Sequence, residues 1–226
     1  MNPENRSPQT GCLRCGSCCE QGGPALHTED LALLESGRLH PGQLVTVRRG
    51  ELALAPLGTC PEPVQAEFLK VQGRDGSWRC CFFDRENSGC AIYDHRPLAC
   101  RILECWEPGP LLDIAGRDLL NRFACIADDD PLLTLVRLHE SQVPCPDLSC
   151  LSDLLKDPAS REARLHALSR QVQLDLMLRD RAVREHRLSV ALELFYFGRP
   201  LFQLLKPLGI QVRESGQGVV LHYEGP

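Results

Sequence analysis

Apolar residues are spaced differently along the two parts of the chain. Before residue 96 they come in short groups separated by polar and glycine-containing turns, and several groups alternate with polar residues as strands do. After residue 96 the spacing becomes helical and the segments become longer. The pattern predicts short strands and helices first, and mainly helices afterwards.

The first part contains one predicted helix and two predicted strand pairs. The segment TEDLALLESGRL (28–39) predicts a helix with Thr28 as its N-cap and Gly37 at its end. The segment LVTVRRGELALAPL (44–57) alternates about Arg49 and Gly50 and predicts a hairpin. A second pair is expected from VQAEFLKV (64–71) and SWRCCFF (77–83), joined through Asp75 and Gly76.

Proline and aspartate mark the starts of the later helices. Pro97 fits the first position of a helix in RPLACRILEC (96–105). An aspartate cap followed by proline begins two further helices, at Asp130 and Pro131 and again at Asp157 and Pro158.

The last part of the chain predicts a helical hairpin and a terminal strand pair. VREHRLSVALELFYF (183–197) is expected to pack back on the helix before it, and IQVRESGQGVVLHYE (210–224) to turn around Gly216 and Gly218. We therefore expect an α+β fold: a small cysteine-rich, metal-binding N-terminal domain over residues 1–126, and a helical extension over 127–226 packed on it.

Composition narrows the class of protein. The chain has 226 residues, of which 43 % are apolar, enough for a core that needs no covalent staples. The net charge of -5 and the pI of about 5.8 provide no basic field, so we expect no nucleic acid partner. No apolar run approaches a membrane span and the first residues contain no apolar leader, so we expect a cytoplasmic protein that does not bind membranes.

The 13 cysteines all lie between Cys12 and Cys150. An odd number cannot pair completely, and cytoplasmic thiols are kept reduced. Metal binding or catalysis therefore explains them better than disulfides do.

Two compact clusters contain most of these cysteines. In GCLRCGSCC (11–19), three cysteines are spaced by three, which lets a tight loop turn their thiolates toward one point, and a fourth follows directly. In CCFFDRENSGCAIYDHRPLACR (80–101) four more follow. The combination is a strong signal for a metal or iron–sulfur site.

The sequence here resembles the CxxCxxCC family of zinc- or iron-chelating proteins. The resemblance rests on CLRCGSCC, on CCFFD where the family tends to have C-P-F-L-D, and on CAIYDHRPLACR, which matches C-x-I-Y-x-x-R-P-x-x-C-R. It implies zinc or iron, including a 4Fe-4S cluster, as cofactor. Flagellin lysine methylases contain a similar cysteine pattern. The metal ligands implied, with one outlying position added, are Cys12, Cys15, Cys18, Cys19, Cys80, Cys90, Cys100 and Cys125.

The number of ligands leaves two arrangements open. Eight cysteines make two four-thiolate sites, whereas seven make one closed site and one with an open position. His95 either completes the second site or faces solvent. Cys81 stands where the family has proline, and the scattered Cys60, Cys105, Cys145 and Cys150 are not assigned.

Three arginines within the motifs are candidates to offset the charge of the thiolates. A divalent ion with four thiolates has a net charge of about -2, which is costly to bury without compensation. Arg14, Arg96 and Arg101 can donate hydrogen bonds to sulfur, or else Arg96 and Arg101 pair with Asp94 or Glu104.

Two functions remain open at this stage. The first is a cytoplasmic metal-chelating protein, with a protein partner on its C-terminal helices. The alternative is an iron–sulfur enzyme, redox-active or a protein lysine methylase. The chain contains no G-x-G-x-x-G, P-loop, H-E-x-x-H or G-x-S-x-G motif, so no catalytic residue is predicted.

Overall fold

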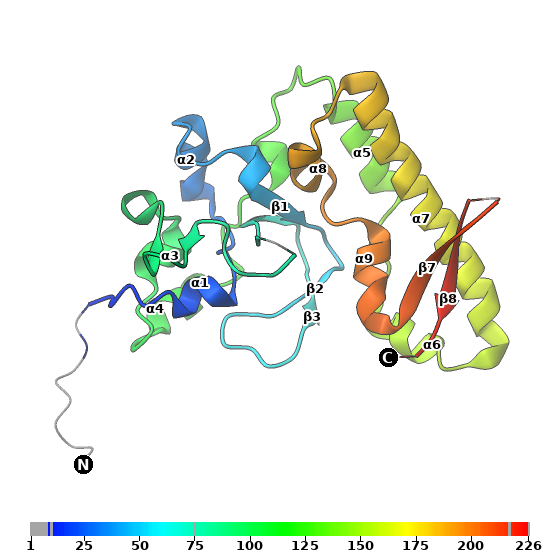
Figure 1. Ribbon diagram of the computed structural model, residues 1–226, viewed down its shortest axis with the longest axis horizontal. Helices are drawn as coiled ribbons and strands as arrows, with labels where there is room; N and C mark the ends of the chain where they lie inside the picture. The colour runs from blue at the N-terminus through cyan, green and yellow to red at the C-terminus, as the bar shows by residue number, and fades with distance from the viewer. Residues whose placement is uncertain (1–8, 10, 75, 217, 226) are drawn as a thin grey trace, which may run out of the picture.

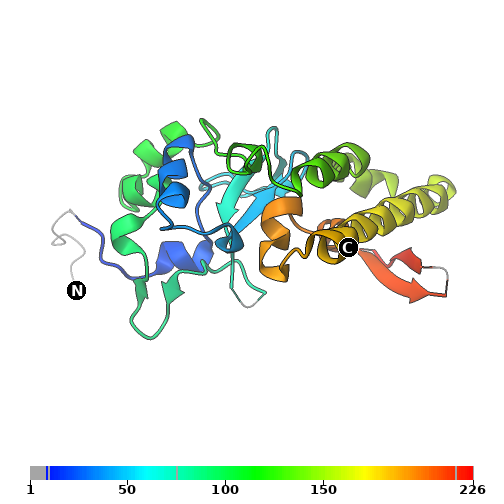
Figure 2. The ribbon, with the colours of Figure 1, turned by 90° about the horizontal axis from the view of Figure 1, so that it is seen from above.

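The computed structural model describes residues 9, 11–74, 76–216 and 218–225. Helices make up 45 % and strands 16 % of the structure, so the predicted α+β class is confirmed. The two cysteine motifs, residues 12–19 and 80–100, lie at one end of an elongated molecule and the long helix α7 (Pro158–His186) at the other (Figures 1 and 2).

The helices are short before residue 130 and longer after it. The α-helices are α1 (Ser17–Gln21), α2 (Leu31–Glu35), α3 (Leu98–Ile102), α4 (Gly109–Ile114), α5 (Leu133–Gln142), α6 (Leu148–Leu154), α7 (Pro158–His186), α8 (Val190–Phe197) and α9 (Leu201–Leu205). Single 3₁₀ turns are η1 (Thr28–Asp30), η2 (Pro41–Gln43), η3 (Tyr93–His95), η4 (Arg122–Ala124) and η5 (Lys206–Leu208). No helix of the described residues is both long and apolar enough to cross a membrane.

The strands of the described residues pair two by two, always antiparallel. They are β1 (Leu44–Val47) with β4 (Phe68–Val71), β2 (Leu52–Ala53) with β3 (Glu62–Pro63), β5 (Phe83–Asp84) with β6 (Gly89–Cys90), and β7 (Ile210–Ser215) with β8 (Gly218–Tyr223). The last pair confirms the predicted terminal hairpin, although residue 217 in its turn lies outside the described residues.

The hairpin predicted over 44–57 is wrong. β1 pairs with β4, and β2 pairs with β3 instead. All four residues of β1 are buried, so this strand runs through the interior, and its neighbour β4 contributes the buried Leu69 and Val71 to the same core. The residues between β1 and β2 turn inward as well: the Arg48 N–H donates to the Glu51 carboxylate at 3.0 Å.

The second predicted pair is also wrong. Among the described residues, no strand pairing joins 64–71 to 77–83: β4 pairs with β1, and Phe83 pairs with Cys90 in the β5–β6 ribbon. An isolated bridge joins Cys80 to Gly73, two residues beyond the first segment. Asp75, half of the predicted turn, lies outside the described residues. Alternation alone could not show that β4 was already paired with β1.

The proline and aspartate signals hold fully at one helix. α7 begins at Pro158, and the Asp157 side chain accepts a hydrogen bond from the Ala159 N–H at 3.2 Å. The α7–α8 hairpin is confirmed too, because the two helices contact each other around Arg187, which adopts a left-handed conformation.

The other starts are displaced. α3 begins one residue after Pro97, which is its N-cap, and η1 has His27 rather than Thr28 as its N-cap. α5 begins at Leu133, because the Asp130 carboxylate caps a local turn at Leu132 N–H (2.8 Å) and accepts the Tyr196 hydroxyl hydrogen bond at 2.7 Å. A local cap motif identifies a turn, and the tertiary partner decides whether a helix follows directly.

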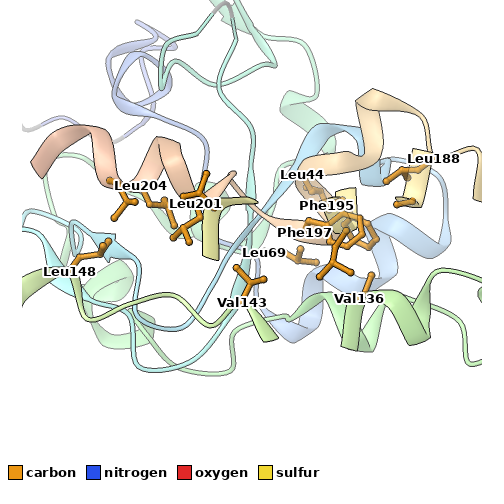
Figure 3. Close-up of a cluster of buried hydrophobic side chains, with 14 of the residues drawn as sticks. Leu44, Leu69, Val136, Val143, Leu148, Leu188, Phe195, Phe197, Leu201 and Leu204 are labelled. Atoms are coloured by element: carbon orange, nitrogen blue, oxygen red, sulfur yellow. The ribbon is translucent and has the colours of Figure 1, made fainter. Parts of the chain in front are cut away.

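One hydrophobic core spans both parts of the chain (Figure 3). Leu44 of β1 and Leu69 of β4 pack in the same cluster as Phe195 and Phe197 of α8 and Val136 of α5. The β1–β4 pair is therefore covered by C-terminal helices on one side, while the cysteine motifs lie toward the other end of the molecule (Figure 1). The division at residue 126 stays a prediction.

A buried ion network joins the same two parts. The Arg48 and Arg122 side chains are fully buried, and both guanidinium groups contact the Glu140 carboxylate of α5, Arg48 Nε at 3.0 Å. Arg122 also lies 3.1 Å from the carboxylate of Glu67, just before β4. Buried charges of this kind are tolerated only when they are paired, so the network fixes α5 against the strands.

A second buried polar cluster lies among the C-terminal helices. Asp175 of α7 accepts hydrogen bonds from His139 Nε2 of α5, from Arg179 Nε and from the Leu201 N–H, each at 2.7 Å. The side chains of His139 and Asp175 are fully buried. Burial lowers the pKa of His139, while the hydrogen bond with Asp175 acts in the opposite direction.

This burial predicts a pH dependence of stability. The unfolded chain binds a proton at His139 near pH 6.5, whereas the folded chain binds it only at lower pH. The free energy of unfolding should therefore fall as the pH drops below about 6.5, by at most about 1.4 kcal/mol per pH unit from this group. Urea unfolding of the wild type and of His139→Gln at several pH values checks this prediction. The free energy of unfolding of His139→Gln should vary less with pH. Parallel profiles would contradict the assignment to His139.

Candidate metal centre

The first cysteine motif ends in α1, whose start requires a glycine. Gly16, the N-cap of α1, has a φ of 78°, and a Cβ added to it would lie 2.3 Å from the Phe83 ring. The loop can therefore lie flat on Phe83 only because residue 16 has no side chain. Within α1, the Sγ atoms of Cys18 and Cys19 lie 4.0 Å apart.

The second motif is attached directly to this helix. The Cys80 N–H donates to the carbonyl oxygen of Cys19 at 2.9 Å. Beyond Cys80 the chain forms the β5–β6 ribbon, in which Phe83 is paired with Cys90. Two backbone links thus bring Cys90 and Cys80 to the end of α1.

Cys100 comes from α3, and a distant carboxylate holds the start of that helix. Asp30, 1 % exposed, accepts from the Leu98 N–H at 2.7 Å and from the His27 N–H at 2.9 Å. Sequence reasoning missed Asp30, because its capping role toward α3 acts across 68 positions and leaves no local motif.

The thiols of both motifs are close enough to influence one another electrostatically. Burial raises the pKa of Cys100 to about 12, and the charges of Cys80, Cys18 and Cys90 add to this. Burial also raises the pKa of Cys90, with Cys80 and Cys18 again acting on it. The hydrogen bond with Cys18 raises the pKa of Cys19, and burial and the charges of Cys18 and Cys80 raise it further. Five cysteines therefore form one cluster.

Two members of the cluster are shifted toward the thiolate. A hydrogen bond from Cys19 lowers the pKa of Cys18 to about 6, and one from Cys81 lowers the pKa of Cys80 to about 7. Thiolate is the form that binds metals, so these two positions favour the first contacts with a cation.

Two arginines enclose one tyrosine beside the cluster. The guanidinium carbons of Arg14 and Arg96 lie 3.9 Å and 3.6 Å from the Tyr93 ring centroid. Arg96 also donates to the Tyr93 carbonyl oxygen at 2.7 Å, and its charge acts on Cys18, Cys90 and Cys100. Cation–π stacking thus fastens the first motif to the second. Arg101 instead pairs with Glu29.

A lysine reaches the cluster from the strand pair. Lys70 of β4 donates through Nζ to the carbonyl oxygen of Gly23, just beyond α1. Burial lowers the pKa of Lys70, while the charges of Cys80 and Cys100 act in the opposite direction. Sequence reasoning missed this residue, because a single lysine inside an apolar strand resembles any exposed lysine.

Comparison with known proteins identifies the same part of the chain. A family model described as a putative zinc- or iron-chelating domain matches the chain over the segment that contains both motifs. Residues 11–115 match the CxxCxxCC family. No curated protein and no solved structure matches the chain.

The remaining predicted ligands differ in position. We call residues 11–115 the CxxCxxCC region. Cys15 is exposed and lies near the cluster, since Cys18 acts on it; its hydrogen bond with Ser17 lowers its pKa. Cys12 is exposed, and its sulfur accepts the Arg14 N–H. Cys125 lies beyond the CxxCxxCC region: its thiol donates to the Asn121 carbonyl oxygen, and burial raises its pKa to about 11. The structure does not bring Cys125 together with the described thiols of the cluster.

The unassigned residues lie apart or at the edge. His95 is exposed on η3, and Cys60, Cys105 and Cys150 are exposed. Cys145 is half-buried near Glu51 and Arg48. Cys81 contacts Cys80, and its backbone N–H donates to the Gln72 carbonyl oxygen at 3.0 Å.

The donor set of the CxxCxxCC region fits a thiolate-bound metal in chemistry, and one pair of its thiols also fits in spacing. Zinc–sulfur bonds of about 2.3 Å in a tetrahedron place neighbouring sulfurs about 3.8 Å apart. The Cys18–Cys19 separation of 4.0 Å is close to this. As the side chains stand, no three Cys, His, Asp or Glu side chains among the described residues surround one point at ligand distance. Coordination therefore requires side-chain rotation within the cluster.

The contact between Gly16 and Phe83 predicts a sensitive position. Gly16→Ala should lower the metal content of the purified protein and destabilise the CxxCxxCC region, because the methyl group meets the ring and the left-handed conformation costs about 1–2 kcal/mol. Gly11→Ala is the matched control, since a Cβ there meets nothing within 4 Å. Elemental analysis and thermal unfolding of both variants check the prediction. Equal metal content in the two variants would contradict it.

Proposed function

We propose that the chain binds zinc or iron through the thiolates of Cys18, Cys19, Cys80, Cys90 and Cys100. The observation that carries this proposal is the convergence of two cysteine motifs, far apart in the sequence, on the end of α1. The match of residues 11–115 to a putative zinc- or iron-chelating domain supports the same chemistry.

The chain prepares this cluster by local means. The Gly16 turn and the Tyr93 stack position Cys18 and Cys19, the Cys80–Cys19 backbone bond joins the motifs, and Asp30 holds the helix of Cys100. A structural zinc ion supplies about 10–16 kcal/mol of folding free energy at neutral pH. The short strands and helices of residues 11–115 are the part that needs it, since few of their apolar side chains are buried.

An iron–sulfur cluster is the second candidate, and the exposure of the outer thiols favours it. Four cysteines hold such a cluster as they hold zinc, so the number of thiols fits both, but Cys15 and Cys18 are exposed. The outer thiols therefore face solvent, as a redox centre open to a partner requires.

Anaerobic purification, followed by absorption spectroscopy and elemental analysis of one sample, tests the proposal. A colourless protein with stoichiometric zinc supports the structural site. A brown protein with iron and acid-labile sulfide supports the cluster. The proposed function would be refuted if the protein bound less than one metal site per chain both after reconstitution with zinc and after reconstitution with iron and sulfide.

A further inference from the structure

Lysine is rare in this protein. The sequence contains three lysines, Lys70, Lys156 and Lys206, against 22 arginines. Lys156 and Lys206 are exposed, while Lys70 is half-buried and interacts electrostatically with Cys80 and Cys100. An ammonium group is a compact point charge, whereas a guanidinium group is broad and suits stacking or paired contacts. The lysine beside the thiols is therefore a point charge and not a stacking or bidentate group.

The backbone around Lys70 fixes where the ammonium lies. Lys70 is paired with Val45 in the β1–β4 ladder and bridged to Ala25 on its other side. Leu69 and Val71 are buried in the core, so Lys70 extends from the opposite face of β4. Its Nζ donates to the Gly23 carbonyl oxygen, and a Cβ added to Gly22 would lie 3.6 Å from Nζ.

The groups that act on this ammonium are thiols. Among the described residues, no carboxylate lies within ion-pair distance of Lys70, and the charges that favour its protonated form are those of Cys80 and Cys100. A half-buried cation without a carboxylate partner is costly unless another anion offsets it. In the described part of the chain, the anionic groups that act on Lys70 in this way are the thiolates of Cys80 and Cys100.

The signs of the charges are complementary. Four thiolates around a divalent ion have a net charge of about -2, and the two cations Lys70 and Arg96 interact electrostatically with Cys100. Arg96 and Arg14 both stack on Tyr93, and Arg101 pairs with Glu29 at the surface. We propose that Lys70 is the internal counter-charge of the thiolate centre and sets its metal affinity through Cys80 and Cys100, without ligating the metal.

This inference rests on the proposed function, and a set of four variants tests it. Lys70→Met removes both charge and hydrogen bond, Lys70→Gln removes the charge but keeps a donor for the Gly23 carbonyl, and Lys70→Arg keeps the charge. Lys206→Met, on the exposed turn after α9, is the matched control. Zinc affinity is measured by competition with a chromophoric chelator. The thiolate-to-metal charge-transfer absorbance of the cobalt(II) form counts the thiolates bound.

We expect Lys70→Met and Lys70→Gln to weaken zinc binding by about 10–100-fold, with the cobalt charge-transfer absorbance per metal unchanged. Lys70→Arg should recover most of the affinity, and Lys206→Met should bind as the wild type does. Wild-type affinity in Lys70→Gln would overturn the proposal, because the lysine would then act through its hydrogen bond. A Lys70→Arg variant that binds zinc no more tightly than Lys70→Gln would overturn the proposal too. If Lys70→Met does not fold, the Gln and Arg variants decide. A wild-type protein that binds neither zinc nor cobalt would instead refute the proposed function itself.

Discussion

Replacing Cys80 by serine is expected to abolish stoichiometric metal binding. Cys80 is the most central thiol of the cluster: it is 6 % exposed, and its charge acts on Cys19, Cys90 and Cys100. A serine hydroxyl is a poor ligand for metals that thiolates bind well. If a structural zinc site supplies about 10–16 kcal/mol through four ligands, losing one should cost on the order of 100- to 1000-fold in affinity.

Elemental analysis and thermal unfolding, each before and after treatment with a chelator, measure this effect. Wild-type protein should lose thermal stability on chelation, whereas Cys80→Ser should start at the chelated value and change little. Cys60→Ser is the control, since Cys60 is exposed on the loop between β2 and β3. Full metal occupancy in Cys80→Ser would argue against the cluster as the binding site.

The same experiment decides the position of Cys125. Counting thiols from the sequence makes Cys125 the eighth ligand, but the structure places its thiol on the Asn121 carbonyl oxygen. We expect Cys125→Ser to keep its full metal content. A loss equal to that of Cys80→Ser would restore Cys125 to the ligand set.

Replacing Asp175 by alanine is expected to have the largest effect on the C-terminal helices. The change leaves the Leu201 N–H without its carboxylate partner, leaves Arg179 with Glu193 as its remaining carboxylate, and removes the hydrogen bond of His139. Removing one partner of a buried charged pair typically costs about 3–5 kcal/mol. Urea unfolding at pH 7.5, followed by helical circular dichroism, should show a loss of this size.

Asp180→Ala is the matched control on the same helix. Asp180 accepts from Arg184 at 2.9 Å, but both side chains are largely exposed, and exposed pairs contribute little. Asp175→Asn should lie between the two, because the amide oxygen can still accept one hydrogen bond while the charge is lost. Equal stability of Asp175→Ala and Asp180→Ala would show that the buried cluster contributes nothing to folding.

Local signals in the sequence located what depends on neighbouring residues. The Asp157 cap and the Pro158 start of α7 follow from one turn of backbone, and so does the β7–β8 hairpin. The cysteine motifs were located in the same way, because ligand spacing is a local property. Which cysteines meet is a tertiary property, so Cys125 could be counted but not placed.

Pairing between distant segments could not be predicted. The segment that contains β1 and β2 alternates between apolar and polar residues as a hairpin does. In the structure, however, β1 is buried along its whole length and pairs with β4. Asp30 and Lys70 gave no signal for the same reason: each reaches its partners only after this pairing has formed. A charged residue that reaches a site only through the tertiary fold therefore has no sequence motif.

The Arg48–Glu140–Arg122 network has a consequence for dividing this protein into fragments. The family match ends at residue 115, and a truncation near residue 126 looks natural from the cysteine distribution. Such a fragment would contain both guanidinium groups without Glu140, and it would expose the apolar side of β1. We expect it to aggregate on expression, with or without metal. We therefore expect the smallest unit that folds independently to extend well past the cysteine motifs and to include the C-terminal helices that cover β1.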